Sequence, residues 1–194
     1  MNTAQPIRDA KDLERFKQFY RKEEPNLRND LLLTLGLNTA LRVSDLLELR
    51  WRQVYDFEKG AFRVHIALVE QKTGKHTQIF INESILKALI VNKEALEQKA
   101  PVSLEQYLFR SQKGSRLSRV QAWRIIRKAA ESCNISGVIS PHSLRKTFGY
   151  YACKQGVRPA LLMELFNHSS FEVTKRYLGI DQEDKDEVFR TICI

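Results

Sequence analysis

Four side chains that can act together on an anion lie within 36 residues near the end of the chain: His142, Arg145, His168 and Tyr177. A guanidinium stays protonated and binds oxyanions through a fork of donors. An imidazole can move a proton near neutral pH, and a phenol can act as a nucleophile. This combination favours chemistry at a negatively charged group.

The local sequence predicts a helix that presents two of these side chains together. Ser140 is a suitable N-cap and Pro141 a suitable first helical residue. His142 and Arg145 then lie three residues apart on one face of the first turn. The unpaired N–H groups and the dipole of a helix start favour an anion there.

Two further short helices are expected to carry His168 and Tyr177. Gly156 can end the first helix and Pro159 can begin the second. Ser169 and Glu172 have the S-x-x-E spacing of a capping box, which predicts a third helix with Tyr177 in its last turns. A lone tyrosine is far more often a packing residue than a nucleophile, so the role of Tyr177 depends on its neighbours.

Two cations from earlier in the chain are candidates for the same site. Arg42 lies in a predicted turn between helices, and Asp45, three residues later, can hold its guanidinium in place. Lys72 lies in a predicted hairpin turn, where lysine is common and usually solvated, and Lys75 in the same turn is an equal competitor on spacing alone. Neither cation is decisive by itself.

Hydrophobic periodicity predicts the elements that must position these residues. Apolar residues recur at helical spacing after Asp12, after Asn26 as a cap, after Asn82 or Ser84, and after Ser118. Ser44 is expected to cap a short helix over residues 45–50. Alternation over residues 62–68 and 77–82, around the turn at 71–76, predicts a β-hairpin. We therefore expect one domain, mainly α with a small antiparallel β-sheet (α+β).

The composition is ordinary for a globular protein, and its basic charge suggests a polyanionic partner without deciding it. The chain has 194 residues, 43% hydrophobic and 28% charged, with a net charge of +9. Residues 181–194 hold five acids and two bases, so the preceding body is more basic still. A basic body often binds nucleic acid, although a well-solvated basic surface is the alternative.

Other classes of protein are disfavoured. No apolar run approaches the 18 or so residues of a membrane span, and the start has no signal-peptide pattern. The three cysteines, Cys133, Cys153 and Cys193, are odd in number and lack paired spacing, which favours reduced thiols in a cytoplasmic protein. No Cys or His pair has metal-ligand spacing, so we expect no metal and no cofactor.

The chain resembles the tyrosine recombinases, or phage-type integrases, from about residue 26 to residue 180. The matching stretches, in the family's order, are TALRVSDLLELRW, QKTGK, LFRSQKGSRLSRVQAWRII, PHSLRKTF and LFNHSSFEVTKRYLGI. The resemblance implies a catalytic set of Arg42, Lys72, His142, Arg145, His168 and Tyr177, with Asp45 supporting the first arginine. By the same analogy, Ser111, Arg116, Arg119, Gln121 and Arg124 are expected to contact DNA.

The resemblance also implies a reaction, for which these residue types are chemically suited. Arg42 and Arg145 would neutralise a DNA phosphodiester, and His168 would donate to the same oxygens. Tyr177 would attack phosphorus and leave a 3′-phosphotyrosine, and it would lose its proton with the help of the basic pocket or of a base such as His142. Lys72 would protonate the departing 5′-oxygen. Nicking and rejoining as in type IB topoisomerases, or a DNA-binding regulator without activity, are the alternatives.

Two positions depart from the family's pattern. Lys146 and Asn167 stand where histidine and glycine are common, and Asn167 is expected to adopt the left-handed conformation that glycine would. We expect residues 1–180 to form the catalytic domain, without a separate N-terminal DNA-binding domain. The chain would then be a catalytic fragment or a short recombinase. On DNA it should form a dimer to tetramer, with residues 181–194 packing on a neighbouring protomer or on their own core.

Overall fold

Helices dominate the computed structural model, which describes residues 4–178, 186 and 189–192, without the side chains of Arg176 and Leu178. In chain order the named elements are α1 (Ala10–Gln18), the π-helix η1 (Phe19–Glu23), α2 (Leu27–Asn38), α3 (Val43–Glu48), the 3₁₀-helix η2 (Trp51–Gln53), β1 (Tyr55–Asp56), β2 (Ala61–Phe62), β3 (His65–Val69), β4 (His76–Phe80), α4 (Glu83–Glu97), α5 (Arg119–Ser132), α6 (Pro141–Lys154), α7 (Pro159–Leu165) and α8 (Phe171–Leu178). The expected α+β class is confirmed.

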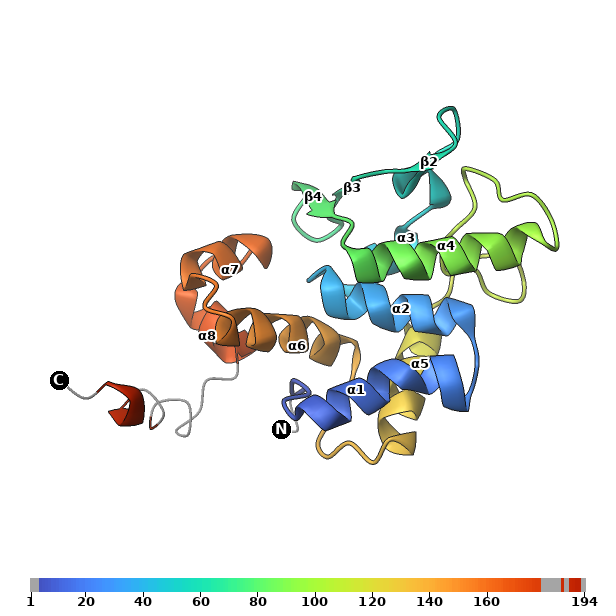
Figure 1. Ribbon diagram of the computed structural model, residues 1–194. Coiled ribbons are helices and arrows are strands. Elements are labelled where there is room, and N and C mark those ends of the chain that lie inside the picture. Colours follow the sequence, from blue (N-terminus) through green and yellow to red (C-terminus); the bar gives the residue numbers. More distant parts are fainter. Residues whose placement is uncertain (1–3, 179–185, 187–188, 193–194) are drawn as a thin grey trace.

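The main core lies between α2, α4 and the strands. Helices α2 and α4 run side by side, with the strand segments beyond α4 (Figure 1). Leu31, Leu35 and Leu89 are fully buried there, as is Ile66 of β3. A second cluster joins α1, α2 and α5 through Phe16 and neighbouring residues. Burial of these apolar side chains is the main stabilising term of such a fold.

A third, smaller cluster supports the C-terminal helices. It consists of Ala40, Leu162 and Phe166, with the ring of Tyr177 packed against it. Helices α7 and α8 pack against α6 on the side of the molecule away from α4 and α5 (Figure 1). The residues at 142, 145, 168 and 177 are therefore held by one small group of helices.

Several predicted helix ends are confirmed. They could be predicted because the residues that cap them lie next to the helix in the sequence. The side chains of Asn26, Asn82 and Ser118 accept backbone N–H bonds at the starts of α2, α4 and α5. Helix α6 begins at Pro141 after Ser140, as predicted. Gly156 follows the end of α6 with φ of 79°, in the left-handed region that favours glycine.

Three predicted boundaries were wrong. The helix expected over 45–50 with Ser44 as cap is α3, which begins at Val43 with Arg42 at the N-cap position. The strand expected over 62–68 is divided into β2 and β3, because Arg63 N–H donates to the Val54 carbonyl instead of to the hairpin partner. Helix α8 begins at Phe171, so Ser170 precedes it and not Ser169.

The hairpin β3–β4 carries the turn that contains Lys72. Its strands pair antiparallel, with His65 opposite Phe80 and Val69 opposite His76. The short pair β1–β2 forms a separate two-stranded sheet. The hairpin projects beside the start of α4, toward the region between α3 and α7 (Figure 1).

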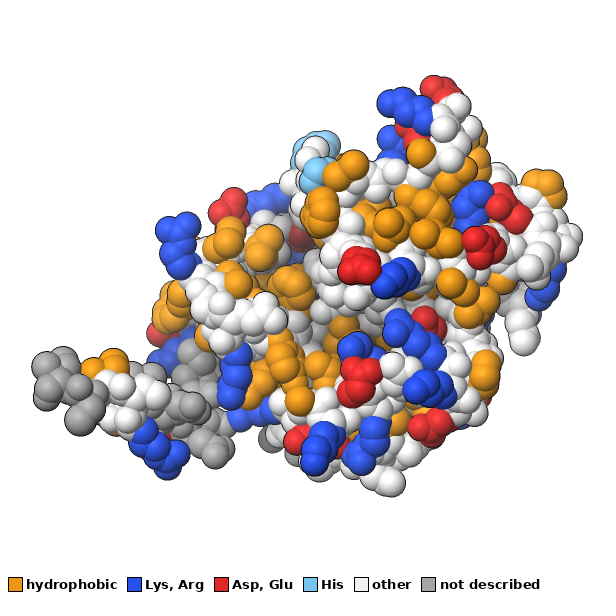
Figure 2. All heavy atoms as spheres, in the orientation of Figure 1, with side chains coloured by type: hydrophobic (Ala, Val, Ile, Leu, Met, Phe, Trp, Pro, Cys, Tyr) orange, Lys and Arg blue, Asp and Glu red, His pale blue; other side chains and the backbone are white. Residues whose placement is uncertain are grey.

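Charged side chains cover the face seen in Figure 2, with Lys and Arg interspersed with Asp and Glu. The hydrophobic side chains on this face gather below the strands, near α4, and again over α6 and α7. None of the helices in the part of the chain that the structure describes combines the length and the apolar character required of a transmembrane helix.

Candidate active site

Arg145 is the most enclosed of the candidate cations, with only 1% of its surface exposed. Its guanidinium donates to the backbone carbonyls of Ala40 and Phe166, and it lies 4.9 Å from the centroid of the Phe166 ring. Burial first, and the charge of Arg42 second, lower the pKa of Arg145 to about 10, so it remains a cation at neutral pH. Its buried Nε has no hydrogen-bond partner among the described residues.

The turn before α3 brings Arg42 and Arg145 into the same site. Ala40 has a φ of 56°, which is unusual for a residue other than glycine. This conformation turns the chain sharply after α2, and the Ala40 carbonyl accepts a bond from Arg145. Arg42 follows two residues later at the start of α3. The two cations are thus linked through one short segment of backbone.

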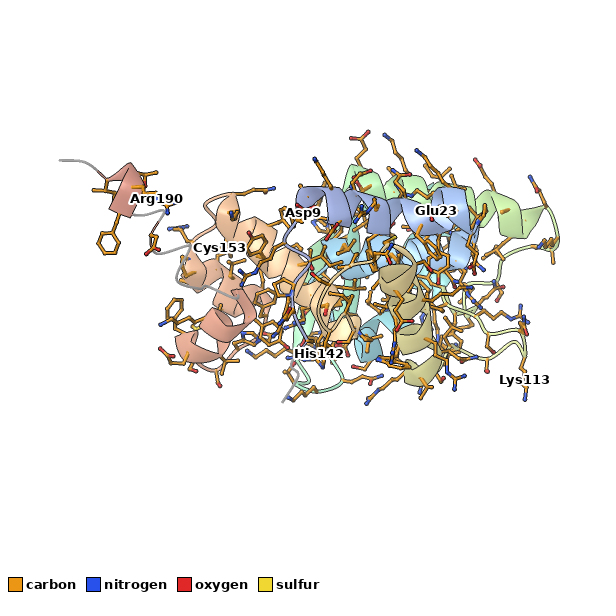
Figure 3. The ribbon with its side chains drawn as sticks, turned by 90° about the horizontal axis from the view of Figure 1, so that it is seen from below. Asp9, Glu23, Lys113, His142, Cys153 and Arg190 are labelled. Carbon is orange, nitrogen blue, oxygen red and sulfur yellow. The ribbon has the colours of Figure 1, made fainter. Side chains whose placement is uncertain are left out.

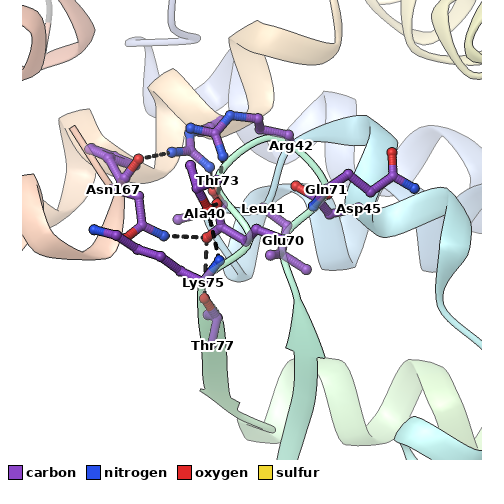
Figure 4. Close-up of polar contacts among 12 residues, drawn as sticks. Ala40, Leu41, Arg42, Asp45, Glu70, Gln71, Thr73, Lys75, Thr77 and Asn167 are labelled. Atoms are coloured by element: carbon purple, nitrogen blue, oxygen red, sulfur yellow. Dashed lines mark hydrogen bonds and ion pairs between the residues drawn. The ribbon is translucent and has the colours of Figure 1, made fainter. Parts of the chain in front are cut away.

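Arg42 is paired with Glu70, an acid that the sequence analysis did not select. Arg42 Nη1 lies 2.6 Å from Glu70 Oε2, and Glu70 is 2% exposed. Figure 4 shows Glu70 at the centre of a set of contacts, with Arg42, Asn167 and Thr77 approaching from different elements. Glu70 precedes the polar turn by one residue, and only its position two residues before Lys72 could have drawn attention to it.

Asp45 does not make the expected direct bond to Arg42. Its Oδ1 accepts the backbone N–H of Gln71 at 3.0 Å, while its Oδ2 is buried without a partner among the described residues. The physical reason is the helix start at Val43, which leaves Arg42 to extend toward the hairpin and Glu70. Asp45 therefore fastens the beginning of the turn that carries Lys72.

Lys72 is exposed at the tip of the hairpin, as is Lys75. The two are distinguished by their electrostatic reach, because the charge of Lys72 contributes to lowering the pKa of both His142 and His168. The same turn is closed by hydrogen bonds from Gly74 N–H to the Glu70 carbonyl and from Glu70 N–H to the Lys75 carbonyl. Lys72 is thus an exposed side chain on a turn that backbone hydrogen bonds hold in place.

His168 is held in the turn between α7 and α8, next to Asn167. Burial first, then the charges of Arg145, Arg42 and Lys72, lower its pKa to about 4. The ring is therefore neutral at pH 7. Its Nδ1 lies 3.0 Å from the hydroxyl of the buried Thr174. In the tautomer that carries its proton on Nε2, His168 can donate a hydrogen bond to an anion.

Tyr177 lies over His168 and beside His142. The ring centroids of His168 and Tyr177 are 4.6 Å apart, and the Tyr177 hydroxyl is 3.5 Å from His142 Nδ1. The pKa of His142 is lowered first by desolvation and then by the charges of Arg145, Lys146, Arg42 and Lys72. Its ring is therefore neutral at pH 7 and can accept a proton. Such contacts are often long without substrate and shorten when it binds.

The structure brings five of the six predicted residues into a chain of direct or shared contacts, with Lys72 on the adjacent turn. Lys146, where the family often has histidine, donates to the Ala4 carbonyl and lies 5.6 Å from the Tyr177 ring centroid. Asn167 has a φ of 49°, which confirms its expected left-handed conformation. Within the described residues, no group of His, Cys, Asp or Glu could hold a metal ion.

The residues expected to contact DNA belong to the loop before α5 and to α5 itself. Figure 3 shows Lys113, at the tip of their loop, far from His142 at the start of α6. Arg119 and Arg124 are exposed on α5. Three others have protein partners: Ser111 with Ser115, Arg116 with Glu48, and Gln121 with the backbone of Ser118. A role in DNA binding remains a prediction for all five.

Known proteins resemble this chain over most of its length. The phage integrase family model matches residues 8–184. A protein of Bacillus subtilis (strain 168), the probable integrase/recombinase YoeC, is 36% identical over 184 residues, which cover 94% of this chain and 93% of that protein. The tyrosine recombinase XerD of Mycobacterium leprae (strain TN) is 28% identical over 168 residues, 84% of this chain and 51% of that protein.

Solved structures share the fold at low sequence identity. The crystal structure of XerA recombinase has a TM-score of 0.77 at 20% identity, over 97% of this chain and 65% of that chain. XerH site-specific recombinase, bound to a palindromic difH substrate in a post-cleavage complex, has a TM-score of 0.78 at 20% identity, over 98% and 54%. The chain thus spans between half and two thirds of XerD, XerA and XerH. The match over residues 8–184 shows that it belongs to the phage integrase family, the tyrosine recombinases.

Proposed function

We propose that this protein is a site-specific DNA recombinase that cleaves and rejoins DNA through a 3′-phosphotyrosine at Tyr177. The observation that carries the proposal is the position of the Tyr177 hydroxyl, 3.5 Å from the neutral His142 and on the same side of α6 as Arg145. The proposed nucleophile, its base and an anion-binding cation therefore lie next to one another.

The phosphodiester is held by cations that are already in place. Arg42 and Arg145 bind its non-bridging oxygens, and His168 donates a third hydrogen bond. Preorganised donors of this kind contribute about 3–4 kcal/mol each to lowering the barrier. Arg145 is well suited to this because its own partners are neutral carbonyls, which leave its positive charge uncancelled.

Bond exchange at phosphorus then follows. The Tyr177 oxygen forms a bond to phosphorus, its proton passes to His142, and the bond from phosphorus to the 5′-oxygen breaks. Lys72 donates a proton to that departing oxygen. The phosphodiester energy is kept in the tyrosine ester, so a 5′-hydroxyl of another strand can reverse the step without ATP.

Trapping on a nicked suicide substrate tests this proposal. Wild-type protein should form a covalent adduct that resists denaturation, and Tyr177→Phe should form none. Absence of an adduct in the wild type, or its persistence in Tyr177→Phe, would overturn the assignment. Strand exchange between two marked sites, compared with relaxation of supercoiled DNA, then separates a recombinase from a topoisomerase-like enzyme.

We further propose that the protein acts as a dimer or tetramer on double-stranded DNA. Most of the C-terminal tail lies outside the described residues, but Phe189 and Ile192 are described and are 80% and 61% exposed. Exposed apolar side chains in a short segment support packing on a neighbouring protomer over packing on their own core.

The thiols of Cys133 and Cys153 are free, in keeping with the cytoplasmic location expected from the sequence.

A further inference from the structure

We propose that Glu70 is a positioning residue of this site, which fixes Arg42, the turn that carries Lys72 and the turn that carries His168 relative to one another. This inference deepens the proposed function and rests on it. Glu70 itself touches no reacting atom in the proposed mechanism. Its effect is exerted through the residues that it holds.

Both carboxylate oxygens of Glu70 are fully used. Oε2 accepts from Arg42 Nη1 at 2.6 Å and from the Thr73 hydroxyl at 3.2 Å. Oε1 accepts from Asn167 Nδ2 at 2.5 Å and from the Thr77 hydroxyl at 3.2 Å. These four donors come from the start of α3, from the hairpin turn, from β4 and from the turn before α8 (Figure 4).

The backbone of Glu70 holds the lysine turn from the other side. Its N–H donates to the Lys75 carbonyl at 2.9 Å, and its carbonyl accepts from Gly74 N–H at 2.8 Å. Lys72 lies between these anchor points. The position from which its ammonium reaches the site is therefore set by the same residue that holds Arg42.

Asn167 extends the connection to His168. The family often has glycine at this position, and Asn167 keeps the left-handed backbone with a φ of 49°. Its side chain adds what glycine lacks, a donor that reaches Glu70. Because His168 is the next residue, the bond limits where its ring can lie.

Glu70 can do this only as an anion, and its surroundings keep it one. Burial alone would raise its pKa, but the hydrogen bonds from Arg42 and Asn167 and the charge of Arg42 outweigh that effect and lower it. Breaking a buried ion pair by neutralising one member leaves the other uncompensated. A glutamine here would also turn an amide NH₂ toward donors from Arg42 or Asn167.

Single-turnover cleavage of the suicide substrate by Glu70→Gln tests the proposal. The rate of adduct formation should fall by roughly 10- to 100-fold, as expected for loss of hydrogen bonds to a charged group. Non-covalent binding of the same DNA by Tyr177→Phe, with and without Glu70→Gln, should agree within about threefold, because the phosphate contacts that dominate affinity remain. A cleavage rate within about threefold of wild type would overturn the proposal.

A double substitution separates positioning from general damage to the fold. The quantity to compare is the logarithm of the fold by which Glu70→Gln slows cleavage. In an Arg42→Ala background this logarithm should be less than about a third of its value in the wild-type background, because the effects of partners in one network are not additive. An equal slowing in both backgrounds would overturn the role through Arg42. Asp30→Asn is the matched control: Asp30 is a buried acid paired with Arg21 outside the site, and its replacement should leave the cleavage rate within about threefold of wild type.

Asn167→Gly isolates the bond to the third element. Glycine accepts the left-handed backbone, so only the amide contact with Glu70 is removed. Cleavage should slow by roughly 3- to 10-fold, the value of one net hydrogen bond. Asn134→Gly, another left-handed asparagine with a φ of 53° at the end of α5, is the control and should leave the rate unchanged. Equal rates for both variants would overturn the link to His168.

The outcome for wild type keeps the two proposals distinct. If the wild type forms no adduct, the proposed function fails. If the wild type forms an adduct and Glu70→Gln forms it equally fast, only the role of Glu70 fails.

Discussion

The two arginines of the site are held in opposite ways. Arg145 is enclosed on α6 and donates to two backbone carbonyls, next to the rings of Phe166 and Tyr177. Arg42 is 15% exposed in its side chain and is paired with the carboxylate of Glu70. One cation is surrounded by neutral dipoles, and the other has a full counter-charge.

This difference has a consequence for the charge each can offer. Carbonyl oxygens orient Arg145 without cancelling its charge, and burial makes its attraction for an anion stronger. The ion pair with Glu70 fixes Arg42 more firmly, but it also neutralises part of the charge that Arg42 could offer to a phosphate. We therefore expect Arg145 to supply more of the transition-state stabilisation, and Arg42 to supply more of the connection to the hairpin.

The largest effect is expected from Arg145→Lys. A lysine has no planar fork, so it cannot satisfy both carbonyls and also donate to a phosphate. Adduct formation should fall by about 10³-fold, and an unsatisfied buried carbonyl should lower the free energy of unfolding by about 1–3 kcal/mol. Suicide-substrate kinetics and thermal melting measure the two effects. A rate within tenfold of wild type would remove the distinction between the arginines.

A smaller effect is expected from Arg42→Lys. A lysine ammonium can still pair with Glu70 as a point charge, although it loses the fork. Cleavage should slow by roughly 10- to 100-fold, and the melting temperature should change less than in Arg145→Lys. If the two lysine variants are equally slow and equally destabilised, the different partners of the two arginines have no functional meaning.

The sequence predicted those parts of this arrangement that depend on local interactions. The caps at Asn26, Asn82 and Ser118 are satisfied within one turn of their own helices, so residue type and spacing suffice to place them. The left-handed conformation of Asn167 followed from its position where glycine is common. The approach of His142 to Tyr177 followed from the resemblance, which supplied the order of the motifs.

The features that were missed depend on contacts between distant segments. The left-handed φ of Ala40 is maintained by packing and by Arg145, which is 105 residues away. Glu70 is recognisable only once α3, the hairpin and the turn at Asn167 are together. The start of α3 at Val43 leaves Asp45 to bond Gln71 rather than Arg42. No spacing within one segment contains this information.

The contact between Asn167 and Glu70 can be tested further through the pH dependence of the stability of Asn167→Asp. Aspartate also tolerates the left-handed conformation, but its carboxylate would lie against Glu70, with Arg42 and Asp45 nearby. Two carboxylates at one site raise the pKa of one of them. When the folded-state pKa of a carboxyl is raised, the folded protein keeps its full stability below the unfolded-state pKa of about 3.9. That stability is lost as the pH rises through the folded-state pKa.

The melting temperature of Asn167→Asp should therefore approach that of wild type at pH 4–5 and fall below it by pH 8, by an amount that corresponds to about 1–2 kcal/mol. Asn134→Asp, at the other left-handed asparagine, is the control for the added charge. A pH-independent deficit in Asn167→Asp would show that its carboxylate does not face Glu70.

The smallest effect is expected from Asp45→Asn, which separates Asp45 from Glu70 as the support of Arg42. Burial first raises the pKa of Asp45, the bond from Gln71 opposes that, and the charge of Glu70 raises it again; the net shift is upward. An ionised Asp45 therefore costs stability at neutral pH, and an asparagine oxygen can still accept the Gln71 N–H. Asp45→Asn should be at least as stable as wild type at pH 7, with a gain that shrinks as pH falls through the raised pKa, and should cleave within about threefold of the wild-type rate. If Asp45→Asn slows cleavage as much as Glu70→Gln does, Asp45 supports Arg42 as the sequence predicted. Arg42 would then depend on two acids, Glu70 and Asp45, while Arg145 depends on backbone carbonyls.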